Sequence, residues 1–339
     1  MNDIKLKYQQ FIHESKRGAI KSIKKCYYPG CLEPSINSHI LQKNGILSKI
    51  AKDNHLWEHV INEFKEESFQ FKRTGINEIF SFKCFCKTHD NMLFKKIELG
   101  EINFMDYNSC LLFTLRTIYN EIFRKEVNLM IYNDLLKSGF VPEENLFFLK
   151  ETIKQEELGR LDLEANAFDI WNDLKGGGES FIFEVRSLLK IDLCLSAFFN
   201  YETTLEMNSY KLNYGKDMNR VSEIFINFFP YNNESILLMG YNKKDEKKVK
   251  PYFNTFFKES EKRVQRKLTN LFLFACETWV ISDGLYNKKI KGIEEEVIYA
   301  SKYSMYTYNE RHNFPLNIFI DSFKSDIKKW YLKNNEFYN

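Results

Sequence analysis

The clearest hydrophobic pattern in the chain is a broad apolar stripe at helical spacing in its middle third. The apolar positions are Leu111, Leu112, Leu115, Ile118, Tyr119, Ile122, Phe123, Leu129 and Met130. Recurrence every three or four residues is typical of a helix that buries one face. Asp106 is a suitable N-cap and Gly139 a suitable end, so the sequence predicts a long buried helix between them. Within it, Glu121 and Lys125 have the spacing of a surface ion pair, with Arg116 one to two turns earlier.

Three other segments have helical character. Apolar residues recur at roughly helical intervals over 46–66, and no proline interrupts the chain between Pro34 and Pro142. The polar segment 141–175 and the phenylalanine-rich segment 252–276 also read as helices, and short helices with aromatic-rich loops follow from Trp279.

The strongest β-strand pattern follows three glycines at 176–178. Apolar and polar residues alternate over 180–188, and short apolar runs follow at 191–199, 224–229 and 235–241. We expect an antiparallel sheet of about four strands with helices against one face. The glycines predict a hinge or tight turn, because the lysine and hydroxyl pair of a phosphate-binding loop does not follow them.

These patterns predict an α+β protein in three parts. Residues 1–105 form a zinc-binding domain, 106–175 a helical linker region, and 176–339 an α+β domain containing the antiparallel sheet.

Composition narrows the class of protein. Hydrophobic residues make up 44% of the 339 residues and aromatic residues 16%, which excludes a disordered chain. No apolar run is long enough to cross a bilayer and the N-terminus lacks a signal-peptide pattern, so we expect a cytoplasmic protein with no membrane partner. The net charge of +3 does not by itself indicate a nucleic-acid-binding protein.

The first 25 residues are locally basic. They contain Lys5, Lys7, Lys16, Arg17, Lys21, Lys24 and Lys25 against Asp3 and Glu14. One interpretation is a basic arm that contacts the phosphates of nucleic acid. The other is an ordinary amphipathic helix with its apolar residues inward, namely Phe11, Ile12, Ile20 and Ile23.

Two pairs of metal-ligand residues give the most specific chemical signal. Cys26 and Cys31 flank a Pro-Gly turn that can direct both sulfurs at one ion, and Cys86 and His89 follow far downstream with C-x2-H spacing. A helix is expected to begin at the second pair, with Asp90 in its first turn. We therefore predict a structural Zn²⁺ bound by these four residues, in a treble-clef arrangement.

His39 leaves two alternatives open. If it is a ligand, one of Cys86 and His89 is released, and Cys84 is a further substitute. If it is not a ligand, it is a histidine held beside a zinc knuckle and is available for catalysis.

The paired cysteines, the Ser38-His39 pair and the segment Cys86-x2-His89-Asp90 resemble the treble-clef HNH endonuclease superfamily over residues 20–100. The resemblance implies that His39 is the general base and that Asp90 lies at the closing helix of the site. Ser38 stands where that family has an acidic residue or a second histidine. A second divalent cation would be required for catalysis of this kind, with Asp90 or Asp53 as an added ligand.

Two functions follow as hypotheses. The first is a zinc protein that binds or cleaves nucleic acid as an HNH-like metal-dependent endonuclease, in bacterial DNA processing or phage defence. The second is a non-catalytic zinc-stabilised interaction or sensor protein that scaffolds a protein partner or forms a homo-oligomer.

Overall fold

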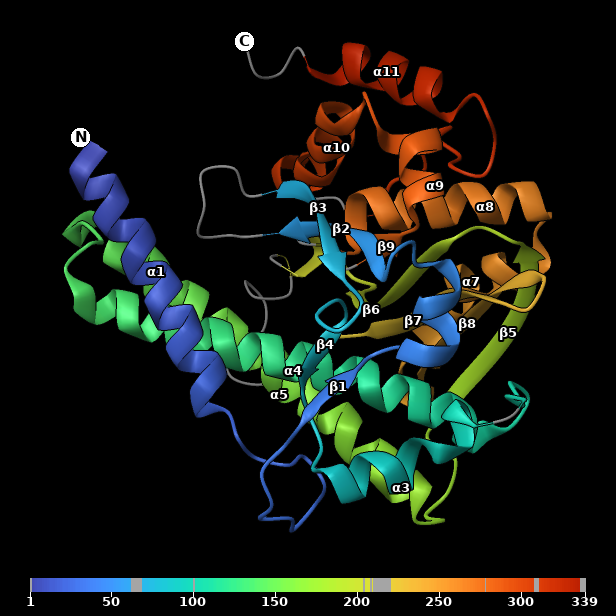
Figure 1. Cartoon of the computed structure of the whole chain (residues 1–339), viewed down its shortest axis with the longest axis horizontal. Coiled ribbons are helices and arrows are strands. Elements are labelled where there is room, and N and C mark those ends of the chain that lie inside the picture. Colours follow the sequence, from blue (N-terminus) through green and yellow to red (C-terminus); the bar gives the residue numbers. More distant parts are fainter. Residues whose placement is uncertain are drawn as a thin grey trace.

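The computed structural model describes residues 2–61, 69–99, 101–203, 205–207, 209, 221–277, 279–307 and 311–335. The chain is a mixed α+β protein, as predicted, in which long helices and a large antiparallel sheet share the core (Figure 1).

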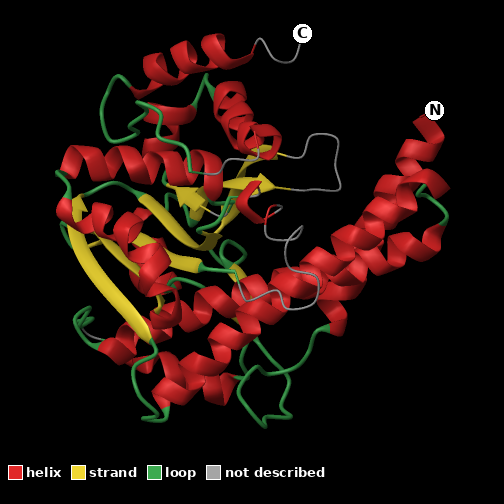
Figure 2. Cartoon of the chain, turned by 180° about the vertical axis from the view of Figure 1, so that it is seen from behind, coloured by secondary structure: helices red, strands yellow, loops and turns green. Residues whose placement is uncertain are grey.

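Three helices form an arm that projects from the body of the molecule (Figures 1 and 2). They are α1 (Asn2–Ser22), the C-terminal half of α4 (Tyr107–Ser138) and the N-terminal half of α5 (Leu146–Leu174). The predicted long helix is confirmed as α4: the carboxylate of Asp106 accepts a hydrogen bond from the Ser109 N–H, and Gly139 ends the helix with φ of 75°. The amphipathic pattern of α1 is also confirmed, since Ile12 is buried in the main core and α1 packs on α4.

The predicted ion pair on α4 is wrong. Lys125 binds Glu156 of α5 at 2.8 Å, and Glu121 binds Arg124 instead. Arg116 is almost completely buried, with 2% of its surface exposed.

The sheet has seven strands, so the expectation of about four is wrong. Its order is β3-β2-β9-β6-β7-β8-β5, and every neighbouring pair is antiparallel. The four predicted strands are β5 (Phe181–Leu189), β6 (Leu193–Asn200), β7 (Glu223–Tyr231) and β8 (Glu234–Asn242). The additional strands are β2 (His55–Ile61), β3 (Phe69–Gly75) and β9 (Trp279–Ile281).

The helix predicted over 46–66 is replaced by a π-helical turn at Lys43–Leu47, the short α2 (Ser48–Ile50) and β2. Asp53 and Asn54 both have positive φ, which makes a tight turn that ends helical structure before β2 begins. Pairing of β2 with β3 and β9 then satisfies its backbone groups, so tertiary contacts decide the conformation.

Helices cover both faces of the sheet, where helices on one face were expected. One face packs on α4, and the other packs on α7 (Glu246–Lys258), which is followed by α8 (Glu261–Asn270) and a π-helical turn at Leu271–Ala275. The single helix predicted over 252–276 is therefore wrong: the chain breaks at Ser260, whose extended backbone starts α8. The continuous apolar runs of β7 and β8 fit a sheet that is buried on both sides.

The remaining elements pack around a second hydrophobic core, on the face of the sheet that also carries α7. They are α9 (Asp283–Leu285), a π-helical turn at Tyr286–Ile290, α10 (Glu294–Thr307) and α11 (Phe323–Asn334). A 3-10 turn at Glu143–Asn145 precedes α5, and another at Lys243–Asp245 precedes α7. Gly176 and Gly178 have positive φ in the connection to β5, as the predicted tight turn requires. Among the described helices, none combines the length and apolar character needed to cross a bilayer.

Candidate metal centre

The first cysteine pair lies in a tight knuckle. The Cys31 N–H donates to the carbonyl of Tyr28 at 3.0 Å, and Gly30 has φ of 78°, a conformation that glycine adopts without strain. This turn brings the sulfurs of Cys26 and Cys31 to the same side of the backbone, as the Pro-Gly sequence predicts.

Two paired strands, which we call the hairpin, and a helix bring Cys86 and His89 to the knuckle. Strand β1 (Asn37–His39) pairs with β4 (Ser81–Lys83), and α3 (Lys87–Glu98) begins four residues after β4. The Tyr27 N–H donates to the carbonyl of Cys84 at 3.0 Å, which places the knuckle beside the start of α3. Cys86 is the N-cap of that helix. The knuckle, the two paired strands and α3 therefore lie together, although β2 and β3 come between β1 and β4 in the chain.

Cys26, Cys31, Cys86 and His89 come together in a cluster that could hold a metal ion, with all four candidate ligand atoms within 4.8 Å of one another. Sγ of Cys31 lies 3.9 Å from Sγ of Cys86, and Nδ1 of His89 lies 3.6 Å from Sγ of Cys26 and 3.2 Å from Sγ of Cys86.

These separations fit a tetrahedral zinc ion. Zinc holds sulfur at about 2.3 Å and nitrogen at about 2.0 Å, which separates two sulfurs by about 3.8 Å and a sulfur from a nitrogen by about 3.5 Å. The donor set of three thiols and one imidazole is also one that zinc prefers in structural sites.

The local electrostatics differ between the cysteines. Burial raises the pKa of Cys26 to about 11. The backbone N–H of His89, at the start of α3, lowers the pKa of Cys86. The Cys86 N–H also donates to Sγ of Cys26 at 3.2 Å. A cation at the centre of the cluster would stabilise the thiolates, so metal binding and deprotonation are coupled.

Aromatic side chains fix the cluster to the rest of the protein. The imidazole of His89 stacks on Tyr28 with ring centroids 3.7 Å apart and an angle of 2° between the planes. Tyr27 stacks on Tyr119 of α4, whose hydroxyl accepts a hydrogen bond from Trp171 of α5 at 2.6 Å. The knuckle is therefore part of the main core and does not stand apart from it.

His39 lies outside the four-residue cluster. It is on β1, and its Nε2–H donates to the carbonyl of Ile76 at 2.8 Å. Burial lowers the pKa of His39, so the neutral imidazole is favoured and Nδ1 carries no proton. Cys84, the other substitute ligand, is completely buried and also lies outside the cluster.

Asp90 lies in the first turn of α3 and is held by two side chains. The hydroxyl of Ser38 donates to Oδ1 of Asp90 at 2.8 Å, and Nη2 of Arg116 lies 3.7 Å from the same oxygen. Nη2 of Arg116 also lies 2.5 Å from the carboxylate of Glu98. Asp53, the other proposed metal ligand, is in the turn before β2 and is exposed.

Arg116 was predicted to lie near a surface ion pair on α4 and is instead buried. Its guanidinium carbon lies 3.8 Å from the ring centroid of Phe94, and its Nε is buried with no hydrogen-bond partner among the described residues. Its position three and four residues from apolar members of the α4 stripe was the available signal, because those neighbours place it on the buried face.

The residues near His39 do not fit a second divalent cation. The carboxylate of Asp90 already accepts from Ser38 and lies against Arg116, and Nε2 of His39 binds a backbone carbonyl. Within the described part of the chain, the cysteine and histidine cluster is the one group of three or more candidate donors close enough to share an ion.

Comparison with known proteins gives no family assignment. No family model, no curated protein and no solved structure matches this chain. The resemblance to HNH endonucleases therefore has no support from related proteins.

Proposed function

We propose that this chain is a zinc-stabilised protein that binds nucleic acid through a basic surface beside the metal centre. Zn²⁺ bound by Cys26, Cys31, Cys86 and His89 would hold the knuckle against the hairpin and α3. The bound ion would act structurally, because four protein ligands leave no open coordination position.

The observation that carries the nucleic-acid proposal is the outward face of α1. Arg17 and Lys21 lie on α1, opposite the face that buries Ile12 and Ala19, and Lys24 follows two residues after the helix ends. All three are exposed, and we call them the α1 stripe. In the described part of the chain none of these three side chains forms an ion pair, whereas Lys25 is bound to Glu126. Cations without carboxylate partners are suited to phosphate contacts.

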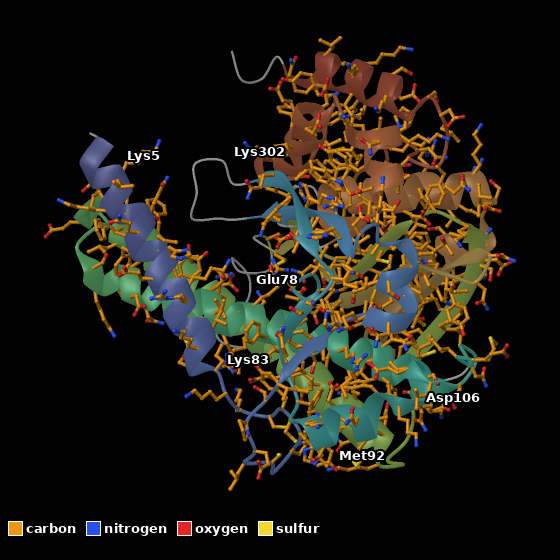
Figure 3. The ribbon with its side chains drawn as sticks, in the orientation of Figure 1. Lys5, Glu78, Lys83, Met92, Asp106 and Lys302 are labelled. Carbon is orange, nitrogen blue, oxygen red and sulfur yellow. The ribbon has the colours of Figure 1, made fainter. Side chains whose placement is uncertain are left out.

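The hairpin extends this surface. Asn37 pairs with Lys83 and His39 pairs with Ser81, so these four side chains share one face of β1 and β4, opposite the buried Ser38 and Phe82. The carbonyl of Lys24 accepts a hydrogen bond from the Ser35 N–H at 2.8 Å, which brings the end of the α1 stripe to the hairpin. In the view of Figure 3, Lys83 lies between the C-terminal end of α1 and β1.

Binding of single-stranded and duplex DNA and RNA, measured at salt concentrations from about 50 to 200 mM, tests this proposal. Affinity should fall steeply with salt, because phosphate contacts release counterions. Absence of binding at low salt, or binding that does not respond to salt, would remove the basic surface as a phosphate-binding site.

A second candidate function is phosphodiester hydrolysis with His39 as the general base, without the second divalent cation that the HNH resemblance implies, because the residues near His39 do not fit one. The hydrogen bond from Nε2 of His39 to the Ile76 carbonyl supports it, because this bond leaves Nδ1 as the unprotonated nitrogen that could accept a proton from water. Asp90 would act on His39 through its negative charge, since its carboxylate is bound to Ser38. Lys43, hydrogen-bonded to Asn77 at 3.2 Å, is a nearby cation for the phosphate.

Replacement of His39 by Gln separates the two candidates. Loss of nuclease activity with unchanged zinc content and unchanged DNA affinity would assign hydrolysis to His39. A wild-type protein that binds nucleic acid and leaves it uncleaved would restrict the function to binding.

A further inference from the structure

Strand β5 forms one edge of the seven-stranded sheet, and its outer side is open. In Figure 1 it runs near the right-hand margin of the molecule. Its register with β8 is continuous from the Phe181–Asn242 pair to the Leu189–Glu234 pair, so no bulge interrupts it. Bulges, prolines and lysines, which prevent many edge strands from pairing, are absent from β5, and its two charged residues are Glu184 and Arg186.

The backbone groups that face outward can be identified from the ends of the strand. The N–H groups of Phe181 and Leu189 donate to the Tyr107 hydroxyl and the Glu261 carboxylate, at 3.1 and 2.8 Å, so they point away from β8. Because the backbone N–H and C=O groups of alternate residues point to the same side of a strand, those of Phe183, Val185 and Ser187 also point away from β8. The described residues offer no hydrogen-bond partner to the backbone groups of these three.

A hollow runs beside this open edge. It has a volume of about 450 Å³ and is lined by β5 and by the segment that leads into α4, including Phe104 and Met105. Met105 is 87% exposed although its side chain is apolar. A strand added to β5 would lie in this hollow and cover Met105.

The charges of β5 match a second copy of itself. In an antiparallel pair of β5 strands centred on Val185, the two Val185 residues face each other. Glu184 of each copy then lies opposite Arg186 of the other. A shift of the centre by one residue would place Glu184 opposite Glu184, or Arg186 opposite Arg186, in an unfavourable contact. The register that also pairs Phe183 with Ser187 is therefore the one that the charges favour.

Both charged side chains are positioned for this pairing. Glu184 is half-buried and makes no hydrogen bond or ion pair within the described residues. Arg186 donates Nη1 to the carbonyls of Phe256 and Glu259, at 2.9 Å each, and keeps further N–H groups for a carboxylate. The opposite edge of the sheet contrasts with β5, because β3 carries Lys72 and Arg73 on a shorter strand.

We propose that two copies of this chain associate through antiparallel pairing of β5 with β5 about Val185, which joins the two sheets into one. The pairing is isologous, so the same surface serves both copies. It uses the outward N–H and C=O groups of Phe183, Val185 and Ser187 and two contacts between Glu184 and Arg186. This interface is independent of the proposed zinc and nucleic-acid functions.

Sedimentation equilibrium of the full chain over a range of concentrations tests the interface. The wild type should form a dimer as its concentration rises. Val185→Pro should weaken association by about 30-fold, because the two paired β5 strands lose two backbone hydrogen bonds. Proline at this outward position removes no bond to β8, so the monomer should keep its circular dichroism spectrum. Glu184→Lys should also weaken the dimer, because the introduced ammonium group would face the guanidinium of Arg186 in the second copy.

Glu144→Lys is the matched control, since it makes the same charge change at an exposed position on the 3-10 turn before α5 and should leave association unchanged. A wild type that stays monomeric at every concentration would overturn the proposal. A dimer of unchanged affinity in Glu184→Lys and in folded Val185→Pro would overturn it as well. If Val185→Pro does not fold, the comparison of Glu184→Lys with Glu144→Lys decides.

Discussion

Sγ of Cys31 and Sγ of Cys86 lie 3.9 Å apart, although 55 positions separate the two residues in the chain. Between them the chain forms the β1 and β4 hairpin and also the β2 and β3 strands that join the large sheet. A metal ion at this point would therefore link the knuckle to α3 and, through them, to the main core.

The metal cluster gives a first prediction. Cys86→Ala should abolish stoichiometric zinc binding and lower the midpoint of thermal unfolding strongly, because metal binding and folding are coupled in sites of this kind. Zinc content by mass spectrometry and unfolding by calorimetry measure the two effects. Cys84→Ala is the control: its thiol is buried two residues away but outside the cluster, so zinc content should be unchanged. Loss of zinc in Cys84→Ala would place that thiol in the coordination shell.

Arg116 gives a second prediction. Arg116→Met should destabilise the protein by about 3 to 5 kcal/mol, because removing one partner from a buried ion pair leaves Glu98 and Asp90 without compensation. Arg124→Met is the control, because it makes the same change on the same helix at a partly exposed ion pair. It should lower the free energy of unfolding by less than about 1 kcal/mol. Urea unfolding of the two variants compares them directly. Equal losses would mean that burial of Arg116 adds nothing to its contribution.

His59 predicts a pH dependence of stability. It is buried at 4% exposure against Trp279, and burial lowers its pKa to about 4 from the ordinary 6.5. Between these values the unfolded chain binds the proton and the folded chain does not, so the free energy of unfolding falls as the pH is lowered. The loss at pH 4 relative to pH 7 should be about 3 kcal/mol for this group.

His59→Phe should remove that part of the pH dependence, measured as the difference between variant and wild type in urea unfolding at several pH values. His13→Phe changes an exposed histidine on α1 and should leave the pH profile as in the wild type. A profile for His59→Phe that runs parallel to the wild type would contradict the assignment.

The α1 stripe of Arg17, Lys21 and Lys24 gives a fourth prediction. Replacing Arg17, Lys21 and Lys24 by Ala should weaken nucleic-acid binding at low salt and reduce the slope of log affinity against log salt by about 2 to 3, since each phosphate contact contributes about 0.7 to 0.9. The matched control replaces Lys258, Lys262 and Arg263, which are equally exposed and carry the same total charge. Equal effects of the two triple variants would mean that the α1 stripe has no special role.

The sequence allowed the metal cluster to be anticipated because short-range spacing determines a knuckle and the first turn of a helix. The long helix α4 was equally predictable, since both its apolar stripe and its caps are local signals. Strands β2, β3 and β9 were not, because β9 has three residues and β2 has apolar residues at spacings that also suit a helix. Their conformation depends on partners far away in the chain, and a single sequence does not reveal those partners.

Arg116 shows a different limit. A charged residue inside an apolar stripe signals burial, yet its partners Glu98 and Asp90 lie on another helix and cannot be read from spacing on α4. The role of Ser38 was missed for the same reason, because its hydrogen bond to Asp90 joins β1 to α3.

X-ray absorption spectroscopy at the zinc edge of the purified full chain, with the metal content measured on the same sample, tests the central claim most directly. We predict one zinc per chain, with three sulfur ligands at about 2.3 Å and one nitrogen ligand at about 2.0 Å. A chain that folds without stoichiometric zinc, or a shell with a different set of sulfur and nitrogen ligands, would contradict the assignment of Cys26, Cys31, Cys86 and His89 as the metal centre.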